Sequence, residues 1–286
     1  VRSLGVLPTP GVSYLLQDGE ADGGAVISAS HNPAEYNGIK FFDGGGFKLR
    51  DEDEAAIEEY LGDPLLDDWR PTGASIGETE PFRDGAERYV RWLRGCDPEF
   101  SRHPGPGVVD CAHGAACGPA KALLGPLKDL HWIGDAPTGL NINEGVGVMH
   151  LSALSGEVLR TGARFGVAFD GDADRTLLCD GRGRVLDGDV ILWVLARWLH
   201  SQGMLGSGLV ATVMSNLALE EKLAQEGIRV FRCAVGDRYV LETMLREGSL
   251  LGGEQSGHVI LRDWVRTGDG LWAAADQMAR GFLLGA

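Results

Sequence analysis

The chain has 286 residues, 44% hydrophobic and 23% charged, a composition that can bury cores and argues against disorder. Its formal net charge of −15 argues against nucleic acid or an anionic membrane surface as a partner. No apolar run approaches the roughly 18 residues that span a bilayer, and no signal peptide opens the chain, so we predict a soluble protein of about two or three domains.

The first 79 residues carry little periodic structure. Strands are predicted at Ala25–Ile27 and, more weakly, around Gly38–Phe42, with an acidic helix at Glu52–Leu61. The polar, turn-rich stretch Arg70–Pro81 follows and marks a domain boundary near residue 80. So few elements make a poor independent core. Residues 1–79 are therefore predicted to be part of a domain whose beginning is missing.

Beyond residue 100, short runs rich in Val and Ile alternate with longer amphipathic stretches. This alternation predicts α/β domains with mixed, mainly parallel sheets covered by helices. The glycine-rich turn Gly181–Gly183 marks a second boundary, which gives domains over residues 80–181 and 182–286. The predicted strands are Gly107–Asp110, Leu130–Ile133, Phe165–Phe169, Thr176–Asp180, Val185–Leu186, Leu209–Val213 and Arg229–Ala234. The predicted helices are Pro119–Leu127, Ser152–Thr161, Asp189–Gln202, Leu217–Gln225 and Asp237–Arg246.

The cysteines indicate a reducing compartment. They are odd in number and none has C-x-x-C spacing, which predicts reduced, mostly buried thiols and a cytoplasmic location rather than disulfides or a zinc site. The five are Cys96, Cys111, Cys117, Cys179 and Cys233.

The clearest chemical signal is the run FDGDADR, residues 169–175, which ends a predicted buried strand. In an extended backbone Asp170, Asp172 and Asp174 share one face, and three converging carboxylates favour a hard cation such as Mg²⁺. An EF-hand loop is excluded, because the sixth and twelfth positions hold Arg and Gly. We predict a metal site rather than an acidic surface turn, with Arg175 binding a phosphate that bridges to the metal.

A second signal is the run SASHNP, residues 28–33, which follows a predicted strand. Ser30 lacks the G-x-S-x-G elbow of acyl-transfer enzymes, whereas phosphoryl transfer needs only a hydroxyl, a metal and cationic neighbours. His31 and Lys40 could supply positive charge. Taken alone, the run is more typical of an ordinary turn.

A third signal is the run GGEQSGH, residues 252–258. In an extended segment Glu254, Ser256 and His258 line one face. A carboxylate and a hydroxyl there suit the neighbouring hydroxyls of a sugar, and His258 could transfer a proton near neutral pH. A glycine-rich loop with a solvated Glu and a packed His explains the run equally well. Nearby, Asp237 is predicted to cap a helix and Arg238 to contact an anion.

Together and in this order, the three motifs resemble those of the α-D-phosphohexomutases. The resemblance extends to VLPTPGVSYL at the start, YNGIKFF, NINEGVG at 141–147, MSNLALE, VGDRYVLE, and TGDG at 267–270. The third motif has Gln255 where phosphomannomutases commonly carry methionine. In this wording it is similar to the bacterial branch of the family that acts on hexosamine phosphates. That branch interconverts glucosamine 6-phosphate and glucosamine 1-phosphate through a phosphoserine and a bisphosphorylated sugar, for cell-wall precursor synthesis.

The resemblance implies a role for each motif residue. The catalytic residues would be Ser30 as phosphoserine, Arg175 holding the moving phosphoryl group, and Lys40 and His258 as proton-transfer groups. The substrate contacts would be His31, Arg238, Glu254 and Ser256. The ligands of Mg²⁺ would be Asp170, Asp172, Asp174 and the phosphate on Ser30. A homodimer is favoured by the resemblance alone.

Three alternatives stay open at this point. The same mechanism could act on glucose or mannose phosphate. An aspartate-nucleophile phosphatase fits the D-x-D spacing of Asp170 and Asp172, although that motif has Thr or Val where Asp174 stands. A non-catalytic sugar-phosphate-binding fragment would fit the absence of recognisable ends.

The family's four domains exceed what this chain shows. We find no counterpart of the family's N-terminal strands, or of the fourth domain whose R-x-S-G-T-E-P-type loop grips the second phosphate. The resemblance therefore implies a piece of a longer enzyme. Alone, it should turn over poorly, because the clamp that positions substrate is missing.

Overall fold

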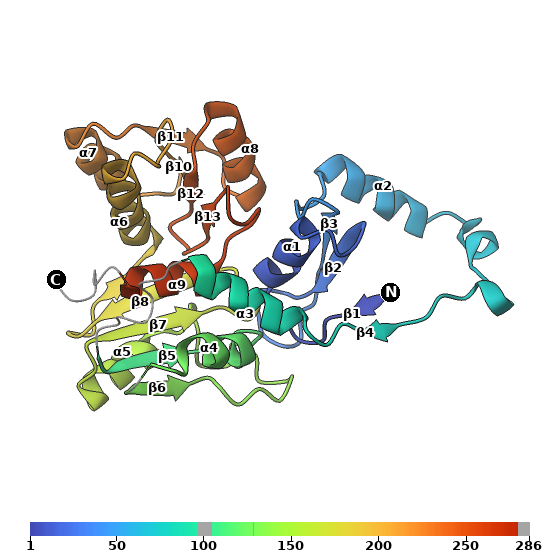
Figure 1. The fold of residues 1–286 in the computed structure, drawn as a ribbon, viewed down its shortest axis with the longest axis horizontal. Helices are drawn as coiled ribbons and strands as arrows, with labels where there is room; N and C mark the ends of the chain where they lie inside the picture. The colour runs from blue at the N-terminus through green and yellow to red at the C-terminus, as the bar shows by residue number, and fades with distance from the viewer. Residues whose placement is uncertain (97–104, 128, 280–286) are drawn as a thin grey trace.

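The computed structural model describes residues 1–96, 105–127 and 129–279. Across these ranges the chain forms two larger mixed sheets flanked by helices and two smaller two-stranded sheets (Figure 1). Most of the strand pairings within the larger sheets place parallel strands side by side, with antiparallel strands added at one edge. The predicted α/β class with mixed, mainly parallel sheets is confirmed.

The N-terminal part is built on an antiparallel pair, β2 (Gly23–Ile27) and β3 (Ile39–Asp43). Helix α1 (Thr9–Gln17) packs on β2, while the acidic helix α2 (Asp51–Leu61) buries no residue. The sequence analysis missed α1, because Pro10 and Gly11 suggest a turn. Proline is tolerated there because the first turn of a helix lacks amide partners in any case.

The turn-rich stretch after α2 contains little regular structure. Two short 3₁₀ turns, η1 (Leu66–Trp69) and η2 (Gly73–Ser75), precede strand β4 (Glu80–Pro81), which pairs in parallel with β1 (Arg2–Ser3). In Figure 1 this stretch and α2 project away from the two larger sheets.

The central sheet has the strand order β6-β5-β7-β8-β9. Its strands coincide with the predicted ranges: β5 (Gly107–Asp110), β6 (Leu130–Ile133), β7 (Phe165–Phe169), β8 (Thr176–Asp180) and β9 (Val185–Leu186). Its helices are α3 (Gly85–Cys96), α4 (Cys117–Leu124), α5 (Leu151–Thr161) and α9 (Gly270–Ala279). Strands β5, β7 and β8 are fully buried, as their continuous apolar runs require.

The C-terminal sheet has the order β11-β10-β12-β13. It consists of β10 (Leu209–Thr212), β11 (Val230–Cys233), β12 (Leu251–Gly253) and β13 (Val259–Leu261), with helices α6 (Gly188–Ser201), α7 (Leu217–Gln225) and α8 (Asp237–Glu247). The hydrophobic pattern of the sequence does not predict β12, because two of its three residues are glycine. A Cβ at Gly252 would lie 2.5 Å from the sulfur of Met244 on α8, so only glycine lets this strand approach the helix so closely.

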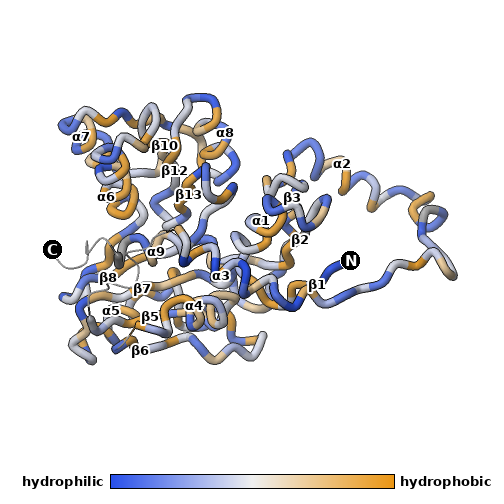
Figure 2. Tube along the Cα trace, in the orientation of Figure 1, coloured by the Kyte–Doolittle hydropathy of each residue, from blue (hydrophilic) through white to orange (hydrophobic). Residues whose placement is uncertain are grey.

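One hydrophobic cluster runs through all three parts, from Leu16 and Phe42 through Phe165 to Leu192. The central strands and α6 are accordingly hydrophobic along most of their length (Figure 2). Helix α9 follows the C-terminal sheet in sequence but packs on β7, β8 and α3 of the central part. The division into domains at residues 80 and 182 stays a prediction.

The five cysteines form no disulfide in the structure, and all but the partly buried Cys96 are buried, as predicted. Among the helices of the described ranges, none is long and apolar enough to cross a membrane.

A buried carboxylate joins α3 to the start of α9. The Tyr89 hydroxyl donates to both oxygens of Asp269, at 2.9 and 3.0 Å, and the backbone N–H of Trp272 donates to Oδ1 at 2.9 Å. Burial raises the pKa of Asp269 from its ordinary 3.8 to about 7, although these hydrogen bonds oppose the rise.

This raised pKa predicts a pH-dependent stability. Because the folded state holds the proton more tightly, the stabilisation is complete below about pH 4 and is lost as pH rises through about 7. The loss amounts to about 4 kcal/mol. We expect the free energy of unfolding, measured by urea titration, to fall over this range, and to fall much less in Asp269→Asn. The exposed Asp263→Asn should keep the wild-type slope; an unchanged slope in Asp269→Asn would contradict the assignment.

Candidate active site

The loop after β7 gathers three carboxylates. Asp170, Asp172 and Asp174 each offer an oxygen, and these oxygens lie within 4.8 Å of one another. All three residues are at most 3% exposed. The backbone turns here, with Ala173 at φ 56°. The extended geometry expected from the sequence is therefore wrong: the carboxylates converge through a tight turn and not through strand alternation.

The loop fits a hard cation. Oδ1 of Asp172 and Oδ1 of Asp174 are buried and accept no hydrogen bond from any described residue. Burial, and then the charges of Asp174 and Asp172, raise the pKa of Asp170 well above its ordinary value. Buried acceptors without donors are costly, and an all-oxygen set is what Mg²⁺ or Ca²⁺ prefers. These carboxylates could therefore hold a divalent metal ion.

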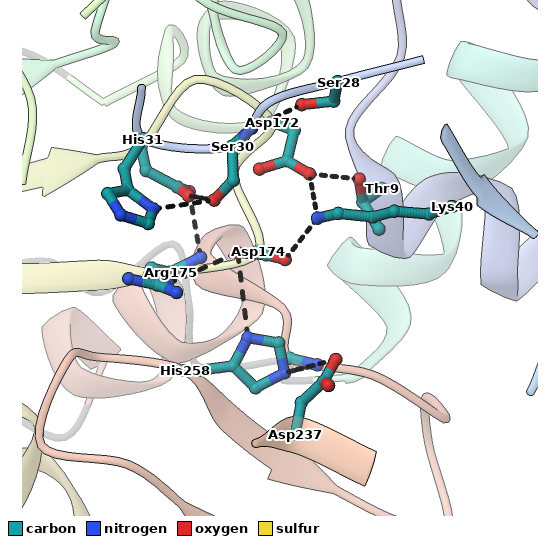
Figure 3. Close-up of polar contacts among 12 residues, drawn as sticks. Thr9, Ser28, Ser30, His31, Lys40, Asp172, Asp174, Arg175, Asp237 and His258 are labelled. Carbon is teal, nitrogen blue, oxygen red and sulfur yellow. Dashed lines mark hydrogen bonds and ion pairs between the residues drawn. The ribbon is translucent and has the colours of Figure 1, made fainter. Parts of the chain in front are cut away.

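Lys40 reaches the same loop from β3 (Figure 3). Its ammonium donates to Oδ2 of Asp172 at 2.6 Å and to Oδ2 of Asp174 at 3.0 Å. The Thr9 hydroxyl, at the start of α1, donates to the same Asp172 oxygen at 2.5 Å. Burial disfavours the ammonium, but the two carboxylates outweigh it and raise the pKa of Lys40. Lys40 is therefore a fixed positive charge in this structure.

Ser30 faces the acidic loop from the N-terminal part of the chain. Its hydroxyl donates to Oδ2 of Asp170 at 2.7 Å and lies 3.3 Å from Nδ1 of His31. The residue has a left-handed φ of 53°, which turns the hydroxyl out of the strand direction. The side-chain amide of Asn143 donates to the Ser30 carbonyl at 2.9 Å and holds this turn against the central part. Burial, and then the Arg175 charge, lower the pKa of His31.

Arg175 and His258 border the loop on its other side. The Arg175 backbone N–H donates to Oδ1 of Asp170 at 3.1 Å, and its Nε is buried without a hydrogen bond to any described residue. Nδ1 of His258 lies 3.7 Å from Oδ1 of Asp174. Nε2 accepts from the Gly268 N–H at 2.8 Å and lies 3.8 Å from Oδ2 of Asp237. Arg175 thus keeps an unused donor beside the acidic loop.

The segment expected to be extended around Glu254 is a turn between β12 and β13. The Gly257 N–H donates to the Glu254 carbonyl at 3.0 Å, so the alternation predicted for Glu254, Ser256 and His258 is wrong. The Glu254 carboxylate accepts from the Gly236 N–H at 3.0 Å. The Ser256 hydroxyl is buried and has no hydrogen-bond partner among the described residues.

The start of α8 also differs from expectation. Gly236, not Asp237, occupies the N-cap, whereas Asp237 forms an ion pair with Lys48 and lies 3.8 Å from Nε2 of His258. Arg238, the predicted anion contact, pairs with Asp51 and with Glu242. The helix cap predicted at Asp237 is therefore wrong: Asp237 is the first residue of the helix, where its Oδ1 accepts from the Arg238 backbone N–H at 2.9 Å and its Oδ2 binds Lys48.

Four further residues of the site were missed: Thr9, Lys48, Asn143 and Asp237. Asn143 lies within NINEGVG, and Thr9 within VLPTPGVSYL, so the segments that carry the resemblance could have singled them out. Lys48 and Asp237 come together from positions 189 residues apart, and nothing local in the sequence signals that pair.

A cavity of about 960 Å³ borders the site on the N-terminal side. Ser30 and Asp172 line it together with apolar side chains that include Val6, Ile27 and Tyr36. Lys40, Arg175 and His258 are not among its lining residues.

The fold and the site together define a class of α/β protein. In it, a serine hydroxyl from one part of the chain faces an acidic loop, of the kind that binds a metal cation, from another part. Family models narrow this class: phosphoglucomutase/phosphomannomutase alpha/beta/alpha domain I matches residues 1–64, and domain III matches residues 187–280. Together they match more than half of the chain. The chain belongs to the phosphoglucomutase/phosphomannomutase family, which confirms the resemblance read from its motifs.

Curated relatives agree with this assignment. The chain is 46% identical over 280 residues to the phosphoglucosamine mutase of Bacillus subtilis, covering 96% of this chain and 61% of that protein. It is 50% identical over 274 residues to that of Leifsonia xyli, covering 95% and 59%. The chain thus spans about three fifths of the length of these relatives.

Solved structures share the fold. A phosphoglucomutase/phosphomannomutase family protein from Burkholderia thailandensis matches with a TM-score of 0.84 and 26% identity, over 100% of this chain and 64% of that one. N-acetylphosphoglucosamine mutase from Aspergillus fumigatus, solved with GlcNAc-6P and magnesium, matches with a TM-score of 0.72 and 17% identity, over 96% and 74%. At that identity the second likeness concerns the fold alone.

Proposed function

We propose that the protein interconverts glucosamine 6-phosphate and glucosamine 1-phosphate, with Ser30 as the phosphorylated residue and Mg²⁺ as the metal. The observation that carries the proposal is the 2.7 Å contact between the Ser30 hydroxyl and Asp170, within a loop that keeps two unpartnered buried carboxylate oxygens. A phosphate on Ser30 would be held beside this loop. Its charge requires the cations that surround it, Lys40 and Arg175.

The transfer moves one phosphoryl group between two oxygens. The P–O bond to Ser30 breaks as a P–O bond to the free sugar hydroxyl forms, the hydroxyl proton passes to a base, and the Ser30 oxygen keeps the electron pair. The bisphosphorylated sugar then turns over and returns its other phosphoryl group to Ser30. When bound, Mg²⁺ offsets the negative charge on the transferring group. Arg175, with its unused Nε donor, is placed to hold that group.

The remaining residues divide between proton transfer and sugar binding. Lys40 and His258 flank Asp174 and are the proposed proton-transfer groups. A lysine in the charged form, as here, is suited to donate rather than accept a proton. Glu254 and the buried Ser256 hydroxyl are the proposed contacts to sugar hydroxyls. His31 and Arg238 are proposed as weaker substrate contacts.

The sugar is assigned from the relatives. Those at 46–50% identity are named phosphoglucosamine mutases, which favours a hexosamine phosphate over glucose or mannose phosphate. Initial rates on the three sugar phosphates test this choice; faster turnover of glucose or mannose phosphate would overturn it. Five cysteines without a disulfide between them favour a reducing compartment such as the bacterial cytoplasm. A homodimer stays a prediction.

Phosphosite mapping tests the mechanism. After incubation of the chain with Mg²⁺ and glucosamine 1,6-bisphosphate, we expect mass spectrometry to find phosphate on Ser30 in the wild type and on no residue of Ser30→Ala. Ser75→Ala, at an exposed position in η2, removes a serine hydroxyl without touching the turn that holds Ser30 and is the matched control. Phosphate on Asp170, labile to hydroxylamine, would support an aspartate-nucleophile phosphatase instead. An unmodified chain that still binds the bisphosphate would support a non-catalytic binding role.

A further inference from the structure

The segment between β3 and α2, residues 46–51, crosses to the C-terminal part of the fold and is here called the clasp. Its aromatic residue, Phe47, packs against the hydrophobic cluster beneath α8 that includes Val240 and Met244. The guanidinium of Arg266 lies 4.8 Å from the centre of the Phe47 ring, within the range of a cation–π contact. A side chain of the N-terminal part thus completes the core of the C-terminal part.

Two ion pairs flank this apolar contact. Lys48 binds Asp237, and both side chains are about three quarters buried, at 23% and 22% exposed. Asp51, the first residue of α2, binds Arg238 at a more exposed position. The partners of the clasp are therefore the first two residues of α8. Exposed pairs contribute little alone, but these accompany the partly buried aromatic contact of Phe47 at the same place.

The start of α8 also holds the loop between β12 and β13, which carries Glu254 and His258. The Gly236 N–H, one residue before the helix, donates to the Glu254 carboxylate at 3.0 Å. Asp237 lies 3.8 Å from Nε2 of His258. A contact that fixes residues 236–238 therefore fixes Glu254 and His258 as well.

We propose that the clasp is a positioning element: Phe47 and Lys48, by binding the start of α8, set the distance between Ser30 and the loop that carries Glu254 and His258. Ser30 and the clasp both belong to the N-terminal part, on either side of the β3 strand that carries Lys40. A shift of the C-terminal part by about 1 Å would cost transfer rate steeply, about 10²-fold. The proposal rests on the proposed function for its catalytic consequence, and on the contacts alone for its structural one.

The test compares Phe47→Ala, Lys48→Ala and Lys48→Arg with Lys121→Ala. Lys121 pairs with Asp135 at 2.7 Å, far from the clasp, and provides a matched lysine–aspartate control. Hydrogen–deuterium exchange is followed in peptides covering residues 46–51 and 236–240. The rate of Ser30 phosphorylation is measured against glucosamine 1,6-bisphosphate concentration, with Mg²⁺, at low and high salt.

We expect Phe47→Ala and Lys48→Ala to exchange faster in both peptides and to lower the maximal phosphorylation rate roughly 10-fold. Lys48→Arg should restore most of that rate, because it keeps the charge. High salt should slow the wild type more than Lys48→Ala, since both keep the exposed Asp51–Arg238 pair but only the wild type also has the Lys48–Asp237 pair to screen. Lys121→Ala should match the wild type throughout.

Wild-type exchange in Phe47→Ala and Lys48→Ala would overturn the clasp itself. Faster exchange with an unchanged rate would overturn its positioning role. A wild type in which Ser30 is never phosphorylated would instead contradict the proposed function, a result that the exchange data distinguish from failure of the clasp.

Discussion

Replacing Asp172 with asparagine is expected to lower the rate of Mg²⁺-dependent Ser30 phosphorylation by about 10³-fold or more. Oδ1 of Asp172 is one of the two buried oxygens of the acidic loop that accept no hydrogen bond from a described residue, so it is a ligand position that protein donors do not contest. Asparagine preserves the size of the side chain and an acceptor for the Thr9 hydroxyl. The substitution removes the charge that a divalent cation needs. We therefore expect the substitution to weaken Mg²⁺ binding while the fold is retained.

Isothermal titration calorimetry with Mg²⁺ separates these effects. We expect weak or no heat of binding in Asp172→Asn while its circular dichroism spectrum stays that of the wild type. Asp180→Asn is the matched control, because Asp180 is also 3% exposed and is the last residue of β8 in the same sheet, but binds Arg184 outside the loop. Wild-type Mg²⁺ affinity in Asp172→Asn would remove this carboxylate from the ligand set.

The central strands could be predicted from sequence to the residue, and physical reasons explain why. Strands β5 and β7 are buried on both faces, so their apolar runs are uninterrupted and end sharply at Asp110 and Asp170. Helix α1 could not be predicted in this way, because its proline and glycine suggest a turn. Strand β12 could not be predicted either, because Gly252 and Gly253, which permit close packing, carry no hydrophobic pattern.

The site divides in the same way. The three aspartates can be singled out from sequence because they lie within one short run, although they converge through a turn, and Ser30 is singled out by the resemblance of its motif. Residues that come together only through tertiary contacts cannot be singled out in this way. Lys48 follows a run of glycines, and Asp237 stands where helix caps commonly occur. Their pairing depends on packing Phe47 against α8, a long-range contact that local patterns cannot specify.

Replacing Lys40 with alanine is expected to destabilise the metal-free chain by about 3–5 kcal/mol. The Lys40 ammonium is the hydrogen-bonding cation that joins Asp172 and Asp174, at 2.6 and 3.0 Å. Without this ammonium, the two carboxylates are buried beside Asp170 with less positive charge to offset the cost of their burial. Mg²⁺ supplies positive charge at the same place, so it should recover more stability in Lys40→Ala than it adds to the wild type.

Thermal unfolding in EDTA and in Mg²⁺ measures this coupling directly. Lys40→Arg should stay close to the wild type in EDTA, because it retains the charge, whereas Lys121→Ala removes a more exposed pair and should change Tm little. Equal Mg²⁺-induced shifts in Lys40→Ala and the wild type would show that lysine and metal do not share the carboxylates. A larger shift in Lys40→Ala, together with a phosphorylation rate that Mg²⁺ does not restore, would separate the two roles of Lys40: the metal can replace its charge in the fold, but not the proton it supplies in the reaction.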